Sequence, residues 1–204
     1  MVKIYRFAAI FAAAAFACGF VPAILAAQAP EAKAELPVLV TSCGQSIGPT
    51  TIKVVLQRLK LACDIEPLAT PEMLQAKAKA GTPYKSLIIT MGASLKGMGA
   101  AGIEIDDELA RAAALIAEAR KEGIKIIGAH IEGMKRRSQG AAAGDTTDEQ
   151  SIDAVAPNSQ ILLVLKEGNA DGRFTVISQA KKIPLVECEK MMDLIPALEK
   201  LFAK

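Results

Sequence analysis

Residues 86–122 have the pattern of a buried strand, a glycine-rich loop and an amphipathic helix, and this order of elements leaves few possible folds. Residues 87–91 form an apolar run, and glycines follow at positions 92, 97, 99 and 102. Such a run is typical of a strand that is buried on both faces of a parallel sheet. A helix is then predicted over 106–122. This arrangement places backbone N–H groups and a helix N-terminus at the carboxyl edge of the sheet.

The same alternation recurs along the chain. Strands are predicted at 37–43, 64–68, 84–91, 124–131, 160–165 and 184–188, and helices at 50–62, 70–80, 106–122, 151–156, 174–181 and 190–202. Pro67 lacks a donor for a strand ladder, so residues 64–68 are expected near a sheet edge. Strands and helices in alternation predict an α/β fold of three layers, doubly wound, with a mainly parallel sheet of five to six strands. The expected class is Rossmann-like or flavodoxin-like.

The amino-terminal residues have the pattern of a secretory signal peptide. Lys3 and Arg6 precede an apolar run over 7–25, and small residues follow. We expect a signal peptide over 1–27, a flexible leader over 28–35 and a single α/β domain over 36–204, secreted or periplasmic after cleavage. A retained membrane anchor and a lipoprotein acylated at Cys18 are the alternatives.

Charge and composition exclude some classes of function. The chain has 24 basic and 22 acidic residues, so removal of Lys3 and Arg6 leaves 22 of each. A near-neutral mature protein argues against nucleic acid as a partner. Cys43, Cys63 and Cys188 would remain after cleavage, without a CxxC motif, and at most one disulfide is expected. No cofactor and no metal are predicted.

Polar residues follow the predicted strands at the edge where open parallel sheets bind ligands. The candidate ligand-binding residues are Gln45, Ser46, Ser94, Lys96, Gly97, His130, Glu132, Asn169 and Asp171. Backbone donors with Gln45, Ser46, Ser94 and Lys96 would form one wall of a site, and His130 with Glu132 the other. We therefore expect the protein to bind a small polar or anionic ligand.

Each of these residues also has a purely structural explanation. The glycines suit tight turns, and Asn169 and Asp171 suit turn chemistry. The loop over 92–97 lacks the spacing of a phosphate-binding loop. His130, the only histidine, suits a core position, a ligand contact or, with Glu132 and Cys43, a metal site.

Two other classes of function stay open. One is a hydrolase or transferase in which His130 acts with a serine or cysteine, the candidates being Cys43, Ser46 and Ser94. The other is an interaction module, an accessory of a membrane transporter, that uses the polar segment 132–150. A hydrogen bond from His130 to a nucleophile would favour the first, and an exposed apolar patch beside that segment the second.

Three segments resemble a group of exported bacterial α/β proteins that is known only as a domain of unknown function. They are residues 38–46 (VLVTSCGQS), 92–102 (GASLKGMGAAG) and 167–172 (EGNADG). The resemblance extends over everything after the leader and implies export and one domain. It implies no activity, and Cys43 stands where such proteins are expected to have a small residue.

Overall fold

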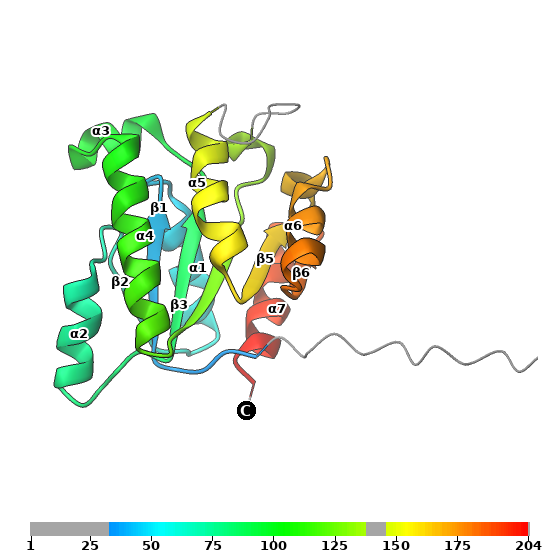
Figure 1. Cartoon of the computed structure of the whole chain (residues 1–204). Coiled ribbons are helices and arrows are strands. Elements are labelled where there is room, and N and C mark those ends of the chain that lie inside the picture. Colours follow the sequence, from blue (N-terminus) through cyan, green and yellow to red (C-terminus); the bar gives the residue numbers. More distant parts are fainter. Residues whose placement is uncertain (1–32, 138–145, 204) are drawn as a thin grey trace, which may run out of the picture.

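The computed structural model describes residues 33–137 and 146–203, in which six parallel strands form one sheet (Figure 1). Their order is β2-β1-β3-β4-β5-β6. This order is flavodoxin-like, and its reversal of direction lies between β1 and β3. The strands are β1 (Val38–Cys43), β2 (Cys63–Ile65), β3 (Ser86–Met91), β4 (Lys125–His130), β5 (Ile161–Leu165) and β6 (Leu185–Cys188). The predicted α/β fold with a parallel sheet is confirmed.

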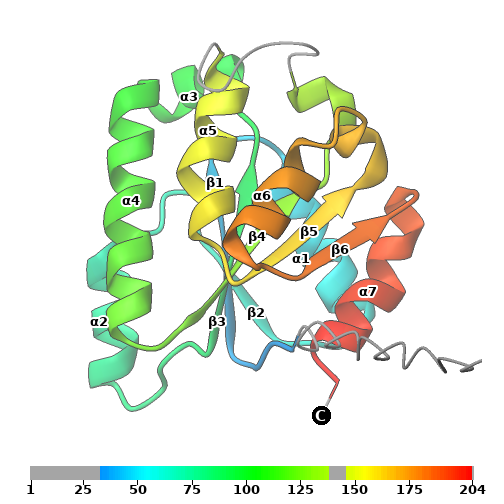
Figure 2. The ribbon, with the colours of Figure 1, turned by 45° about the vertical axis from the view of Figure 1, so that its right-hand side comes forward.

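Helices cover both faces of the sheet (Figures 1 and 2). One face packs against α1 (Gly48–Arg58) and α7 (Leu194–Leu201). The other packs against α2 (Pro71–Lys79), α4 (Ile105–Lys121), α5 (Thr147–Val155) and α6 (Arg173–Lys181). Because the four central strands are apolar in continuous runs, each face buries its own core cluster. Three layers are the result, as the alternation of elements predicts.

A short helix, α3 (Leu95–Ala101), lies where the sequence analysis predicts a loop, so that part of the prediction is wrong. The Ser94 hydroxyl accepts a hydrogen bond from Gly97 N at 3.1 Å and caps the first turn. Gly102, at a φ of 67°, ends the helix in the left-handed region. A capping serine and a terminating glycine therefore outweigh the low helix propensity of Gly97 and Gly99.

Other element boundaries differ by a few residues from the predicted ones. Helix α1 begins at Gly48, two residues before the predicted start at residue 50, with Pro49 in its first turn. Helix α5 begins at Thr147 and not at 151, because the Thr146 hydroxyl accepts a hydrogen bond from Glu149 N. Strand β2 lies at the sheet edge, as Pro67 indicates.

The predicted signal peptide, Cys18 and most of the predicted leader lie outside the described residues, as do residues 138–145 of the polar segment. Within 33–137 and 146–203, no helix combines the length and the apolar character that a membrane crossing requires. Export and cleavage therefore stay predictions. Among the described residues, Cys43, Cys63 and Cys188 are free thiols.

All six strands run in the same direction, so their carboxyl ends share the upper edge of the sheet in Figure 1. The loops that carry the nine candidate residues emerge at this edge. The contacts that these residues make there decide which of them remain available to a ligand.

Candidate functional site

The carboxyl ends of β1 and β3 flank the point where ligands bind in folds of this order. A carboxylate of the protein itself occupies that position. Glu108, fully buried at the start of α4, accepts hydrogen bonds at Oε1 from Gly44 N and from Gln45 Nε2, both at 2.8 Å. Arg111 Nε donates to its Oε2 at 2.9 Å. Glu108 therefore takes the donors that the sequence analysis assigns to an anionic ligand.

The backbone donors after β3 also have internal partners. Ala93 N donates to Asp148 Oδ1 at 2.7 Å, and Gly92 N donates to the Ser151 hydroxyl at 3.0 Å. Both acceptors belong to α5. Burial raises the pKa of the Asp148 carboxyl, and the hydrogen bond from Ala93 opposes this shift. These amides are thus satisfied without a ligand.

The loops after β1 and β3 lie directly against each other. Gln45 adopts a φ of 53° and forms an isolated antiparallel bridge with Ala93. A Cβ on Gly97 would stand 2.0 Å from the Gln45 carbonyl oxygen, so this glycine is required for the close approach. The structure thus brings Gln45, Ser94 and Gly97 close together. Their contacts at this point are with one another.

The other two predicted residues of this wall, Ser46 and Lys96, do not take part in these contacts. The Ser46 hydroxyl accepts a hydrogen bond from Gly48 N at 3.3 Å, at the start of α1. Lys96 is exposed on α3, and no described residue forms an ion pair with it. Their predicted role as ligand contacts stays a prediction.

His130 is fully buried at the end of β4. Its Nδ1 lies 3.2 Å from the Met91 carbonyl oxygen and its Nε2 lies 3.1 Å from that of Gly133. Burial lowers the pKa of the imidazole. The ring stacks on Phe174 with 5.1 Å between centroids.

No hydrogen bond in the described part of the chain joins His130 to Cys43, Ser46 or Ser94. Burial also raises the pKa of the Cys43 thiol to about 12, so this group stays protonated near neutral pH. The described residues thus offer the hydrolase alternative no paired base and nucleophile.

Asn169 and Asp171 support the loop after β5. Asn169 Nδ2 donates to Thr175 Oγ1 at 2.9 Å and to Glu187 Oε1 at 2.7 Å. Asp171 Oδ2 accepts from Arg137 at 2.5 Å. Burial opposes ionisation of Asp171, but its hydrogen bonds with Arg137 and with the Arg173 backbone outweigh burial and lower its pKa.

Arg137 belongs to a buried ion-pair network that the sequence analysis missed. It donates to Glu149 Oε1 at 2.7 Å, and Arg173 bonds both Glu149 and Asp153. The guanidinium of Arg137 also lies over the ring of Phe174, 5.6 Å from its centroid. The network joins α5 and α6 to the segment that follows β4. The charged side chains of this network therefore have their partners within the protein.

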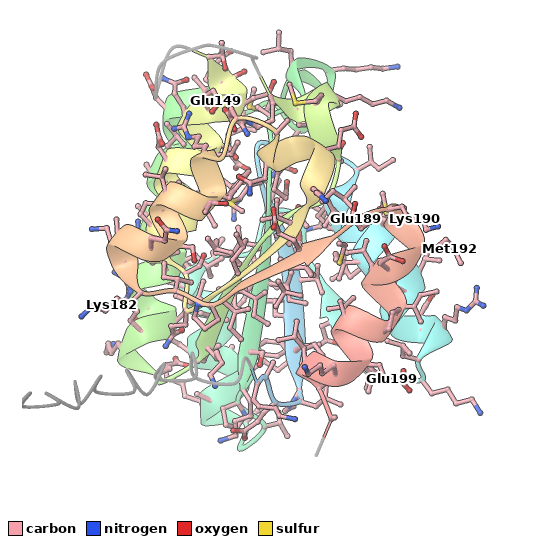
Figure 3. The ribbon with its side chains drawn as sticks, turned by 90° about the vertical axis from the view of Figure 1, so that its right-hand side faces the viewer. Glu149, Lys182, Glu189, Lys190, Met192 and Glu199 are labelled. Carbon is pink, nitrogen blue, oxygen red and sulfur yellow. The ribbon has the colours of Figure 1, made fainter. Side chains whose placement is uncertain are left out.

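On the opposite face of the sheet, a groove of about 420 Å³ opens over the carboxyl ends of β4, β5 and β6. It lies between α1, the short turn η1 (Gly133–Arg136) and the turn η4 (Met191–Asp193). Its apolar surface comes from Ile47, Ile131, Leu165 and Met191. Figure 3 shows Glu189 and Lys190 at the turn between β6 and α7, on the rim of this groove.

The charged wall of the groove contains groups of both signs. Glu132 accepts from Arg136 Nε at 3.2 Å through Oε2, but its Oε1 is buried and has no hydrogen-bond partner in the described residues. Lys135 and Lys190 also line the groove, and within the described ranges neither ammonium has an ion-pair partner. Glu189 pairs with Lys166 at 2.6 Å. Glu167 also lines the groove, and no ion pair in the described ranges includes it. The groove wall therefore carries three carboxylates and two lysines, and Oε1 of Glu132 is a buried acceptor without a partner.

Glu132 is the one candidate residue from the sequence analysis that lines this groove. Lys135 stands within the basic triplet 135–137, which the sequence shows plainly, but its neighbour Arg137 turns inward. Lys190 and Met191 follow β6 directly, so the rule of strand ends would have found them. No group of three or more His, Cys, Asp or Glu side chains in the described chain is arranged to hold a metal ion.

Comparisons with known proteins give the fold a context. A search of curated proteins finds no relative. Among solved structures, a GDSL-like lipase from Bacteroides thetaiotaomicron VPI-5482 is 15% identical with a TM-score of 0.32, over 74% of this chain and 66% of that one. The psychrotrophic esterase EstA from Pseudoalteromonas sp. is 10% identical with a TM-score of 0.34, over 76% and 78%.

An aminotransferase from Mycobacterium tuberculosis is 13% identical with a TM-score of 0.33, over 86% of this chain and 44% of that one. Scores this low carry no argument about activity. A family model, by contrast, matches residues 35–202. The chain therefore belongs to the family described as Domain of unknown function (DUF6305).

Proposed function

We propose that this protein binds a small polar molecule in the groove over the carboxyl ends of β4, β5 and β6. The molecule presents a hydrogen-bond donor to Glu132 and an acidic group to Lys135 and Lys190. The signal-peptide pattern of residues 1–27 supports the further proposal that binding takes place in the periplasm or outside the cell.

The observation that carries the proposal is the unpartnered Oε1 of Glu132. A buried polar atom without a partner costs about 1–3 kcal/mol. Arg136 satisfies only the second oxygen. A hydroxyl or ammonium group of a ligand would relieve this cost once the Glu132 side chain rotates to present Oε1 to the groove that it lines.

The two lysines support an acidic group on the same ligand. Lys135 and Lys190 approach the groove from η1 and from the turn after β6, and Glu132 lies in the same lining. The apolar surface between them lowers the local dielectric and strengthens the attraction of a carboxylate. A hydroxy acid or an amino acid combines the required donor and anion.

Calorimetric titration with 2-hydroxybutanoate, 2-aminobutanoate and unsubstituted butanoate tests the proposal. We expect the hydroxy or amino acid to bind about tenfold more tightly than butanoate, which corresponds to one additional hydrogen bond to a charged group. Glu132→Met should remove this preference. Glu118→Met is the matched control, because Glu118 has similar exposure and also pairs with a cation one turn away, but on α4.

Equal affinities for the three acids, or no binding of any of them, would contradict the proposal. An equal loss of preference in Glu118→Met would also contradict it, because the effect would then not come from the groove.

A further inference from the structure

A second hollow adjoins the groove on the same face of the molecule. It has a volume of about 310 Å³ and lies between α1 and the η4–α7 segment. Thr51 and Met191 line both hollows, so the two adjoin, and together they are called the depression. The second hollow is largely apolar, with surface from Val54, Val55, Met192 and Ile195.

Exposed apolar side chains concentrate at this depression. Seven large apolar residues are exposed in the described chain, and four of them, Ile47, Val54, Met191 and Met192, line one or both hollows. Val54 is 60% exposed and Met192 58%. Figure 3 shows Met192 at the start of the α7 segment, close to Lys190. Clustered exposure of this kind is typical of a binding surface.

We propose that the ligand is an amphipathic anion whose apolar tail occupies the hollow between α1 and α7. This inference rests on the proposed function, since its polar head would lie at Glu132, Lys135 and Lys190. A 2-hydroxy or 2-amino carboxylate with an unbranched alkyl chain has the required chemistry.

The arrangement of polarity along the depression supports this class of ligand. Most charged groups line the groove near η1 and the turn after β6, whereas the hollow between the helices is mainly apolar, with Arg58 as its one charged lining residue. Methionine side chains are flexible and polarizable, so Met191 and Met192 can adapt to a chain. Adjacency to the charged groove favours the tail of a small molecule over a separate protein partner in this hollow.

A chain-length series tests the inference. 2-Hydroxybutanoate and 2-hydroxyoctanoate share the same head, and a methylene that leaves water contributes about 0.8 kcal/mol, or about fourfold in affinity. We expect the octanoate to bind at least about tenfold more tightly in calorimetric titration, since the hollow is partly open. Val54→Gln should reduce this ratio towards one.

Val176→Gln is the matched control, because Val176 is 65% exposed on α6, away from the depression. It should keep the ratio of the wild type. Lys190→Met should weaken both homologues by the same factor, whereas Lys181→Met, on α6 and away from both hollows, should leave both unchanged.

The outcomes separate the two proposals. Equal affinity of both homologues, both weakened by Lys190→Met, overturns the tail but leaves the proposed function standing. A chain-length effect accompanied by affinities that neither Lys190→Met nor Glu132→Met weakens overturns the proposed function. A ratio reduced equally by Val176→Gln, a loss of affinity caused by Lys181→Met, or no binding of either homologue overturns the inference.

Discussion

His130 is a buried residue through which pH can change the stability of the molecule. Both of its ring nitrogens face carbonyl oxygens, those of Met91 and Gly133. A neutral imidazole has only one N–H, so it satisfies only one of these acceptors. Protonation would satisfy both, but burial, helped by the nearby Arg137, lowers the pKa of the ring, while Glu132 acts weakly in the other direction.

We predict that stability to urea falls as the pH drops below about 6.5, the ordinary pKa of histidine. Below this pH the unfolded chain binds a proton at His130, whereas the folded protein, in which the pKa of His130 is lower, leaves this residue neutral. Acid therefore favours unfolding, with a slope of up to about 1.4 kcal/mol per pH unit. Because His130 is the only histidine, His130→Gln should flatten the slope.

The comparison of wild type with His130→Gln isolates this residue, since the carboxylates titrate in both proteins. The single histidine Hε1 resonance should report a pKa below 6.5 in the folded protein. An equal slope in both proteins, or a resonance that titrates above that value, would show that burial does not control this group.

At the scale of elements, short contacts between backbones position the loops at the carboxyl edge. Helix α3 lies against the loop after β1 because Gly97 has no side chain. Gly99, in the same helix, has open space around the position of a Cβ. The two glycines thus differ in tertiary contact but share the same helical context.

We predict opposite effects of alanine at these two positions. Gly97→Ala places a methyl group against the Gln45 backbone and should destabilise the protein by about 1–3 kcal/mol. Gly99→Ala should stabilise it by about 0.5–1 kcal/mol, because it only reduces the entropy of the unfolded chain. Urea midpoints of the two variants check this. Effects of the same sign would mean that α3 does not contact the loop.

At the scale of the whole molecule, the sequence predicts the architecture well because hydrophobic periodicity reports burial. Apolar runs such as 161–165 are buried on both faces, and Gly81 and Gly123 follow α2 and α4 in the left-handed region. The missed helix α3 depends on a cap and on tertiary contact, which outweigh its glycine content. The loops were correctly assigned to one edge, because parallel strands require it.

The location of the proposed binding site is harder to predict, because it depends on which hydrogen-bond donors already have partners within the protein. Glu108 had a detectable signal: it lies four residues before Ala112 and seven before Leu115, on the buried stripe of α4. An acid on that stripe indicates an internal partner. Arg137 and Asp148 lie on irregular segments or first turns, where no periodicity shows which side chains turn inward.

The central claim is that a small polar molecule binds over β4, β5 and β6 and not at the ends of β1 and β3. Backbone amide NMR during titration with 2-hydroxyoctanoate tests it most directly. The account predicts shifts concentrated at Thr51, Glu132, Lys135, Lys190 and Met191, with Gln45 and Lys96 unchanged. Shifts centred on Gln45 and Lys96, or no shifts at saturating ligand, would contradict it.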